Sequence, residues 1–144
     1  MIQEEKRLKN LKLFLKVFGF FTILVMTINM SAFVFQIEAF RPGNSMHGLL
    51  WDDITGHVGP MIFIIYIIWG IYFFKVAKEP LKHRSFLNFT MWANLGHGLI
   101  MIPMAIQDPT YHLRFATDIP FILLTAVGIY LWRPLPESES AYSN

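Results

Sequence analysis

Four stretches of the chain contain no charged residue. They are 21, 21, 23 and 14 residues long and cover residues 17–37, 54–74, 85–107 and 119–132. A helix needs about 20 apolar residues to cross roughly 30 Å of hydrocarbon. The first three stretches therefore predict membrane-spanning helices, and the whole pattern predicts an all-α fold, an integral membrane four-helix bundle.

The fourth stretch is short, because 14 residues rise only about 21 Å in a helix. It spans a membrane if its helix begins near Leu113, which would place Arg114 and Asp118 at the membrane edge with a spacing that lets them pair. Pro120 is tolerated in a first helical turn. It is equally consistent with a helix that starts there, capped by Thr117 or Asp118. We favour a short fourth span whose outer end is sheltered by protein.

The positions of the four charge-free stretches predict one membrane domain over residues 1–134 and a flexible cytoplasmic tail over residues 135–144. The spans are expected at about 14–35, 57–76, 86–107 and 115–132. The outer loop, 36–56, carries the turn signal Arg41-Pro42-Gly43-Asn44 and then a short surface helix from Ser45 to Trp51.

The first apolar stretch is too long for a signal peptide and no A-x-A-like cleavage site follows it, so we expect a retained span. The basic residues before it form either an amphipathic segment on the inner leaflet or a simple helix extension.

Basic residues indicate the orientation of the bundle. Of the twelve Lys and Arg residues, only Arg41 and Arg114 lie in segments on one side of the membrane, and the other ten lie on the opposite side. By the positive-inside rule, the side that carries the ten basic residues is cytoplasmic. The prediction is that both termini lie inside the cell, in a bacterial inner membrane. The ten residues are Lys6, Arg7, Lys9, Lys12, Lys16, Lys75, Lys78, Lys82, Arg84 and Arg133.

Composition supports lipid as the solvent. Hydrophobic residues make up 54% of the 144 residues, whereas soluble domains contain about 45–50% apolar residues. Charged residues make up 15%, against about 25% in soluble domains. The absence of cysteine excludes disulfides, iron–sulfur clusters, zinc-thiolate sites and thiol nucleophiles. A net charge of +2 gives no reason to expect nucleic acid. The expected partners are the lipid bilayer and either other membrane subunits or further copies of the chain.

The third span is the most polar, and His97 lies near its middle. The residue is 13 positions from Arg84 and 10 from Gln107, which corresponds to about 20 Å and 15 Å of helix. Asn94 and Met101 share its face, so this face should point into the bundle.

His97 and Asn94 either tie helices together or act as a ligand, proton relay or substrate anchor. In both cases the imidazole needs a partner, because an unpaired one in hydrocarbon costs several kcal/mol. The candidates on other spans are Thr22, Thr27, Asn29, Tyr66, Trp69 and Thr125.

A second polar group is expected at the outer rim: His47, Asp52, Asp53, His57, Asp108, His112, Arg114 and Asp118. None of the usual zinc or His-box spacings occurs, so we predict no metal site, with His57 and His47 as weak candidates. One haem between His57 and His97 is disfavoured, because the two differ in depth by about 15 Å. Single-His haem or chlorin binding and copper binding are minor alternatives, and the sequence assigns no cofactor.

Several landmarks also follow the order found in a known family. They are Pro80, His83-Arg84-Ser85, Phe89-Thr90, Trp92, His97, His112-Leu113 and Asp118-Ile119-Pro120. Over roughly residues 56–134 the chain resembles an uncharacterised family of small bacterial four-span membrane proteins, a domain of unknown function. The resemblance implies no activity. It directs attention to His97, His112 and Asp118 as one polar layer.

The sequence therefore predicts an accessory or structural subunit of a larger membrane complex. The alternative is a ligand-binding or transport protein for a quinone, a lipid or a small solute. Its candidate ligand-binding residues are His97, Asn94, Trp92, His112 and Asp118. An enzyme is less favoured and no catalytic residue is assigned, because Ser45 and Ser85 lack the contexts of known serine nucleophiles.

Overall fold

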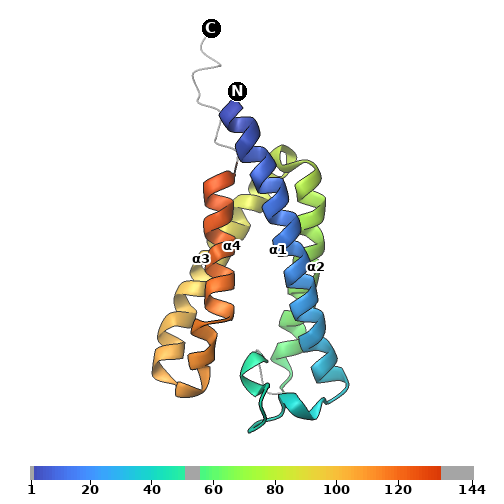
Figure 1. Ribbon diagram of the computed structural model, residues 1–144, viewed down its shortest axis with the longest axis vertical. Helices are drawn as coiled ribbons and strands as arrows, with labels where there is room; N and C mark the ends of the chain where they lie inside the picture. The colour runs from blue at the N-terminus through green and yellow to red at the C-terminus, as the bar shows by residue number, and fades with distance from the viewer. Residues whose placement is uncertain (1, 51–55, 134–144) are drawn as a thin grey trace.

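The computed structural model describes residues 2–50 and 56–133, and every regular element in this part of the chain is helical. The long helices are α1 Ile2–Val34, α2 Val58–Lys78, α3 Arg84–Gln107 and α4 Asp118–Trp132 (Figure 1). Short 3-10 helices connect them: η1 Glu38–Phe40, η2 His47–Leu49, η3 Pro80–His83 and η4 Pro109–Phe115. The all-α fold is confirmed. By length and composition four helical segments can each cross a membrane.

Helix α1 is continuous from Ile2, so the basic residues before the first span extend the same helix. Its 33 residues correspond to a length of about 50 Å. Leu11 and Leu15 are fully buried near its beginning. The structure therefore matches the simple helix extension and shows no turn between a surface segment and a span.

Helix α4 begins at Asp118, three residues after the predicted start at 115. Pro120 lies in its first turn, where its missing N–H removes no helical hydrogen bond. The preceding residues form η4 instead of an earlier α-helical turn. Arg114 on η4 still reaches Asp118, with 4.0 Å between Nε and Oδ2. The expected i, i+4 pair forms although one partner lies outside the α-helix.

In the outer loop, η2 takes up part of the short helix predicted at 45–51. The residue at its N-cap position is Met46 rather than Ser45. Trp51 lies outside the described residues.

The four helices form two hairpins, α1 with α2 and α3 with α4. Gly19 and Gly70 allow the first hairpin to close tightly, since a Cβ on Gly19 would lie 2.9 Å from the Gly70 carbonyl oxygen. Helix α1 also meets α4, where the Phe14 ring fills the space beside Gly128. Figure 1 shows the hairpins together at the end where α1 begins and diverging toward η1 and η2.

Apolar clusters explain this divergence. At the end where α1 begins, one cluster takes side chains from all four helices: Leu11, Leu15, Phe73, Val76, Ala77, Leu87, Met91 and Ile129. Toward the other end the buried residues divide into two clusters. Met101, Ala105, Ile119 and Ile122 join α3 to α4, and Ala32, Phe40 and Leu50 hold the outer loop against α1.

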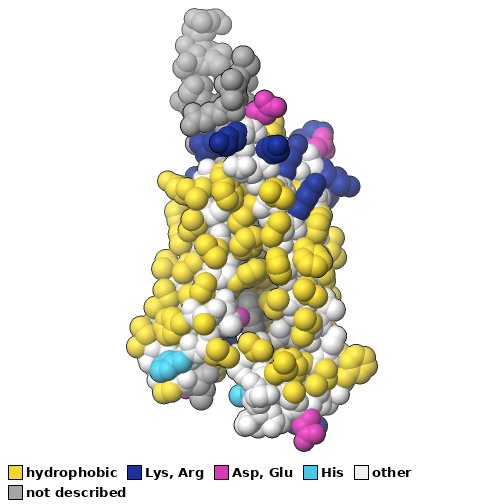
Figure 2. All heavy atoms as spheres, viewed as in Figure 1, with side chains coloured by type: hydrophobic (Ala, Val, Ile, Leu, Met, Phe, Trp, Pro, Cys, Tyr) yellow, Lys and Arg dark blue, Asp and Glu magenta, His cyan; other side chains and the backbone are white. Residues whose placement is uncertain are grey.

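The surface carries an apolar belt with Lys and Arg side chains gathered at one end (Figure 2). We call this the basic end; it holds the beginning of α1, the α2–α3 connection and the end of α4. The opposite end, with η1, η2 and η4, is called the far end.

The close approach of α1 and α2 gives a first prediction. Gly19→Ala should destabilise the protein by about 1–3 kcal/mol, because its new methyl group meets backbone of α2 that cannot rotate away. Thermal unfolding in detergent micelles measures the effect. Gly96→Ala is the matched control, since no atom lies within 4 Å of a Cβ built there. Equal destabilisation by the two substitutions would contradict the packing assigned here.

Candidate functional site

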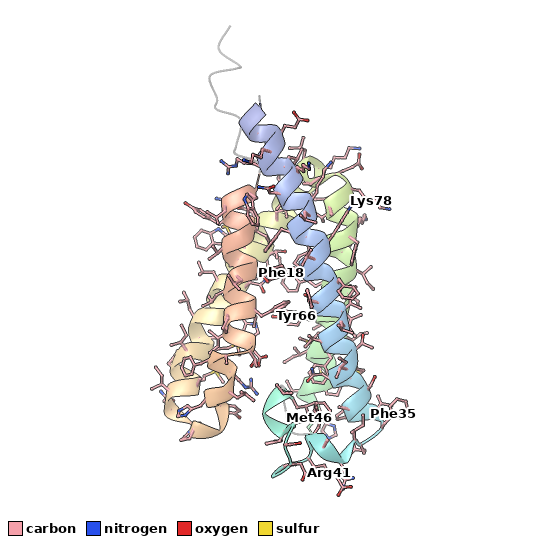
Figure 3. All side chains as sticks on the ribbon, viewed as in Figure 1. Phe18, Phe35, Arg41, Met46, Tyr66 and Lys78 are labelled. Atoms are coloured by element: carbon pink, nitrogen blue, oxygen red, sulfur yellow. The ribbon has the colours of Figure 1, made fainter. Side chains whose placement is uncertain are left out.

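Polar and aromatic side chains face one another from α2 and α3 near the middle of both helices. On α3, Thr90, Asn94 and His97 follow the spacing i, i+4, i+7 and therefore share one face. On α2, Tyr66 and Trp69 follow the spacing i, i+3. Figure 3 shows Tyr66 pointing from α2 toward the other hairpin.

Two hydrogen bonds join these faces. The Tyr66 hydroxyl lies 2.8 Å from Nδ1 of His97, and Nε1 of Trp69 donates to the Thr90 hydroxyl at 3.0 Å. The Tyr66 and Trp69 rings stack with their centroids 5.7 Å apart. In the described part of the chain, α2 and α3 are not among the pairs of helices whose backbones pack closely together. Long aromatic side chains therefore bridge these two helices, and Tyr66 is the partner that His97 needs.

Asn94 lies on the same face but turns back to its own helix. Its side chain is 4% exposed, and Nδ2 donates to the Thr90 carbonyl at 2.8 Å. Thr22 and Thr125 do the same, donating to the carbonyls of Phe18 and Phe121 at 2.7 and 2.9 Å.

The three residues line one small cavity with Tyr66 and Trp69, together with Met26, Phe73, Phe121 and Ile122. Its volume is about 10 Å³, near the minimum needed to hold a single water molecule. This cavity therefore has no room for a quinone or another organic ligand.

A second polar pair lies beyond His97 toward the far end. Arg114 and Asp118 have side chains only 17% and 12% exposed, and the Arg114 guanidinium lies 4.5 Å from the centroid of the Tyr111 ring. The Arg114 charge is within electrostatic range of His97. Figure 2 shows the surface hollowed between the two hairpins in the half toward the far end. Polar groups thus continue from Tyr66 and His97 toward that end.

The structure brings together some of the predicted site residues and separates others. His97 is half-buried, Asn94 is buried, and Asp118 lies on the adjoining α4. Trp92 is 62% exposed and faces away from this site. His112 is exposed, with its ring against Phe115, so the expected layer of His97, His112 and Asp118 lacks its middle member.

Sequence reasoning named Tyr66 and Trp69 only among several possible partners of His97, and it did not place Thr90 in the site. The available signal was a pair of aromatic hydrogen-bonding residues, Tyr66 and Trp69, one helical turn apart in a run of isoleucines over residues 64–71.

The weak metal candidates lie apart from this group. Nδ1 of half-buried His47 is 3.4 Å from the Phe40 carbonyl, and His57 is exposed just before α2. Within residues 2–50 and 56–133, no three His, Asp or Glu side chains are placed to hold a metal ion. Asp52 and Asp53, which belong to the predicted polar rim, lie outside the described residues.

Comparison of the chain with protein-family models, curated proteins and solved structures finds no match. The resemblance over residues 56–134 therefore remains a prediction.

The Tyr66–His97 bond gives a second prediction. In a double-mutant cycle of Tyr66→Phe and His97→Phe, the coupling energy should be about 0.6 kcal/mol and no more than about 1.7 kcal/mol, the range measured for hydrogen bonds between membrane helices. Unfolding in detergent micelles measures each variant. Tyr130→Phe is the matched control for the loss of a tyrosine hydroxyl group, because Tyr130 is 60% exposed. Strictly additive effects of the two substitutions would exclude an energetic role for the bond.

Proposed function

We propose that this protein is an accessory subunit of a larger complex in a bacterial inner membrane. One observation carries the proposal: only 28–33% of the most apolar window of each span is buried within the chain. The larger part of each helix faces outward, where it meets lipid or the helices of partner subunits. The polar interior provides hydrogen bonds between and within helices, and its cavity has room for about one water molecule.

The proposed orientation has the basic end in the cytoplasm. Ten of the twelve Lys and Arg residues belong to that end, and positive charge is retained preferentially on the cytoplasmic side. Both the beginning of α1 and the end of α4 then lie inside the cell.

A second candidate function is ligand binding or transport, and the polar groups between the hairpins favour it. Ionisable residues within a membrane segment are costly and usually face a bundle interior or a water-filled cavity. Here the charge of Arg114, which pairs with Asp118, acts on His97. A quinone, a lipid or a small solute would then bind between the hairpins near His97.

Purification from native membranes tests the two functions together. We expect a tagged chain, extracted in a mild detergent, to retain membrane subunits at a fixed ratio, identified by mass spectrometry. His97→Phe should lower their recovery several-fold by weakening the contact between hairpins, while the activity per assembled complex stays unchanged. Thr125→Val, which removes a buried hydroxyl that bonds only within its own helix, is the control for a general effect of substitution.

Two outcomes would contradict the accessory role. The first is a chain that purifies alone in every mild detergent. The second is loss of activity on His97→Phe with assembly intact, which would favour the binding function. An absorption spectrum and a small-molecule extract of the same sample test that function directly, and clean protein without bound material would exclude a tightly held ligand.

A further inference from the structure

Three helix ends meet at the basic end around two arginines. Arg7 on α1 donates from Nη2 to the backbone carbonyl of Arg133 at 3.3 Å, immediately after α4 ends at Trp132. Nη1 of Arg133 donates in turn to Oδ1 of Asn88, in the second turn of α3. The two guanidinium groups are thus held at the junction of α1, α3 and α4.

Neither arginine forms an ion pair with a carboxylate in the described part of the chain. Glu79 is engaged elsewhere at the same end, with its Oε1 2.5 Å from Nζ of Lys82. The hydrogen bond from Lys82, and then the charge of the same ammonium group, lower the pKa of Glu79. Arg7 and Arg133 therefore concentrate positive charge that the described acidic side chains do not neutralise.

The donors of these arginines are not exhausted by their protein contacts. A guanidinium carries five N–H groups in a planar fork, and each arginine uses one of them in the bonds above. This fork matches the oxygen atoms of a phosphate group, which it binds in a bidentate manner. Both side chains are half-buried, so their remaining donors are held within a narrow region of the surface.

The surroundings of the pair are those of a lipid headgroup. The Arg133 guanidinium lies 5.6 Å from the ring centroid of Tyr130, which is 60% exposed on the outside of α4. Tyrosine is enriched at the headgroup level of membranes. Val127 and Leu124 are 46% and 55% exposed at earlier positions on the same helix and continue this surface toward the middle of the span. A phosphate at the arginines would thus have apolar surface below it for its acyl chains.

We propose that Arg7 and Arg133 bind the phosphodiester of one anionic phospholipid at the α1–α3–α4 junction. The lipid bridges the two hairpins at their basic end, because Arg7 belongs to the first hairpin and Arg133 to the second. This site goes beyond the accessory role and does not depend on it. It also lies at the opposite end of the bundle from Arg114 and Asp118, the pair that favours the ligand-binding function.

Single-lipid binding to the full-length protein tests the proposal. Delipidated protein in detergent micelles is titrated with phosphatidylglycerol or phosphatidylcholine, and bound lipid is counted by native mass spectrometry. We expect phosphatidylglycerol to bind at least fivefold more tightly. Arg7→Gln and Arg133→Gln should each weaken its binding about fivefold, which corresponds to about 1 kcal/mol for one basic side chain near lipid charge. Equal binding of the two lipids by the unaltered protein would overturn the proposal.

Lys9→Gln is the matched control, because it removes one positive charge from an exposed position on the same helix. It should change the binding of phosphatidylglycerol less than twofold, and a loss equal to that of Arg7→Gln would overturn the site in favour of diffuse charge. Arg133→Lys keeps the charge without the planar fork and should bind with intermediate affinity. If Arg133→Gln does not yield monodisperse protein, Arg133→Lys and Arg7→Gln decide the result.

The nearest acidic residues that follow Arg133 in sequence are Glu137 and Glu139, which lie outside the described residues. A variant with both Glu137→Gln and Glu139→Gln tests whether these two carboxylates bind Arg7 and Arg133 in place of the lipid. Unchanged binding of phosphatidylglycerol is expected. A gain of fivefold or more would overturn the lipid as the normal occupant.

Discussion

Hydrocarbon offers no hydrogen bonds, so a polar group in the middle of a span depends on partners that the protein supplies. Most such groups here turn to their own helix: Thr22, Asn29, Asn94 and Thr125 each donate to a backbone carbonyl four residues earlier. Such bonds satisfy a donor without fixing which helix lies next to it. The bonds Tyr66–His97 and Trp69–Thr90 differ, because they join α2 to α3 across a space that their backbones do not close. The relative position of the hairpins depends on these two contacts together with the apolar cluster at the basic end.

The two halves of the bundle consequently differ in how firmly they are held. At the basic end the cluster of eight buried residues draws on all four helices, and Arg7 and Arg133 add polar contacts between them. Toward the far end each hairpin has its own smaller cluster. There the ion pair Arg114–Asp118 is long at 4.0 Å, and the buried Asn29 has an Oδ1 atom with no hydrogen-bond partner among the described residues. An unsatisfied buried acceptor and divided packing both lower the free energy of local opening. Among the described residues, the packing of the far half is therefore divided between the hairpins, whereas that of the basic end is shared by all four helices.

Charge-free stretches were enough to predict how many helices are long and apolar enough to cross a membrane, because solvation by lipid excludes charge over the length of a crossing helix. The start of α4 was harder to predict, since Pro120 permits both an early helix and a cap, and only the fold of η4 distinguishes them. Periodicity correctly assigned Asn94 to a buried face. The same rule argues against Trp92, which precedes it by two residues and so lies about 200° away around the helix. The identity of the His97 partner could not be predicted, because six polar residues on other spans had suitable chemistry and the choice depends on how each helix is rotated.

In the proposed accessory role, shared packing at the basic end and divided packing at the far end suit a subunit that must hold its topology while fitting a neighbour. The basic end fixes the order of the helices through contacts within the chain, and a bound anionic lipid would add a bridge between α1 and α4 at that point. Under that proposal, the far half would adapt to a partner by small changes in the spacing of the hairpins. Tyr66 and His97 lie between these regions, and their hydrogen bond is the last polar contact from α2 to α3 before the hairpins diverge in the described chain. Under the same proposal His97 would have a mechanical role, because a change in that bond would alter the separation of the hairpins that a partner subunit contacts.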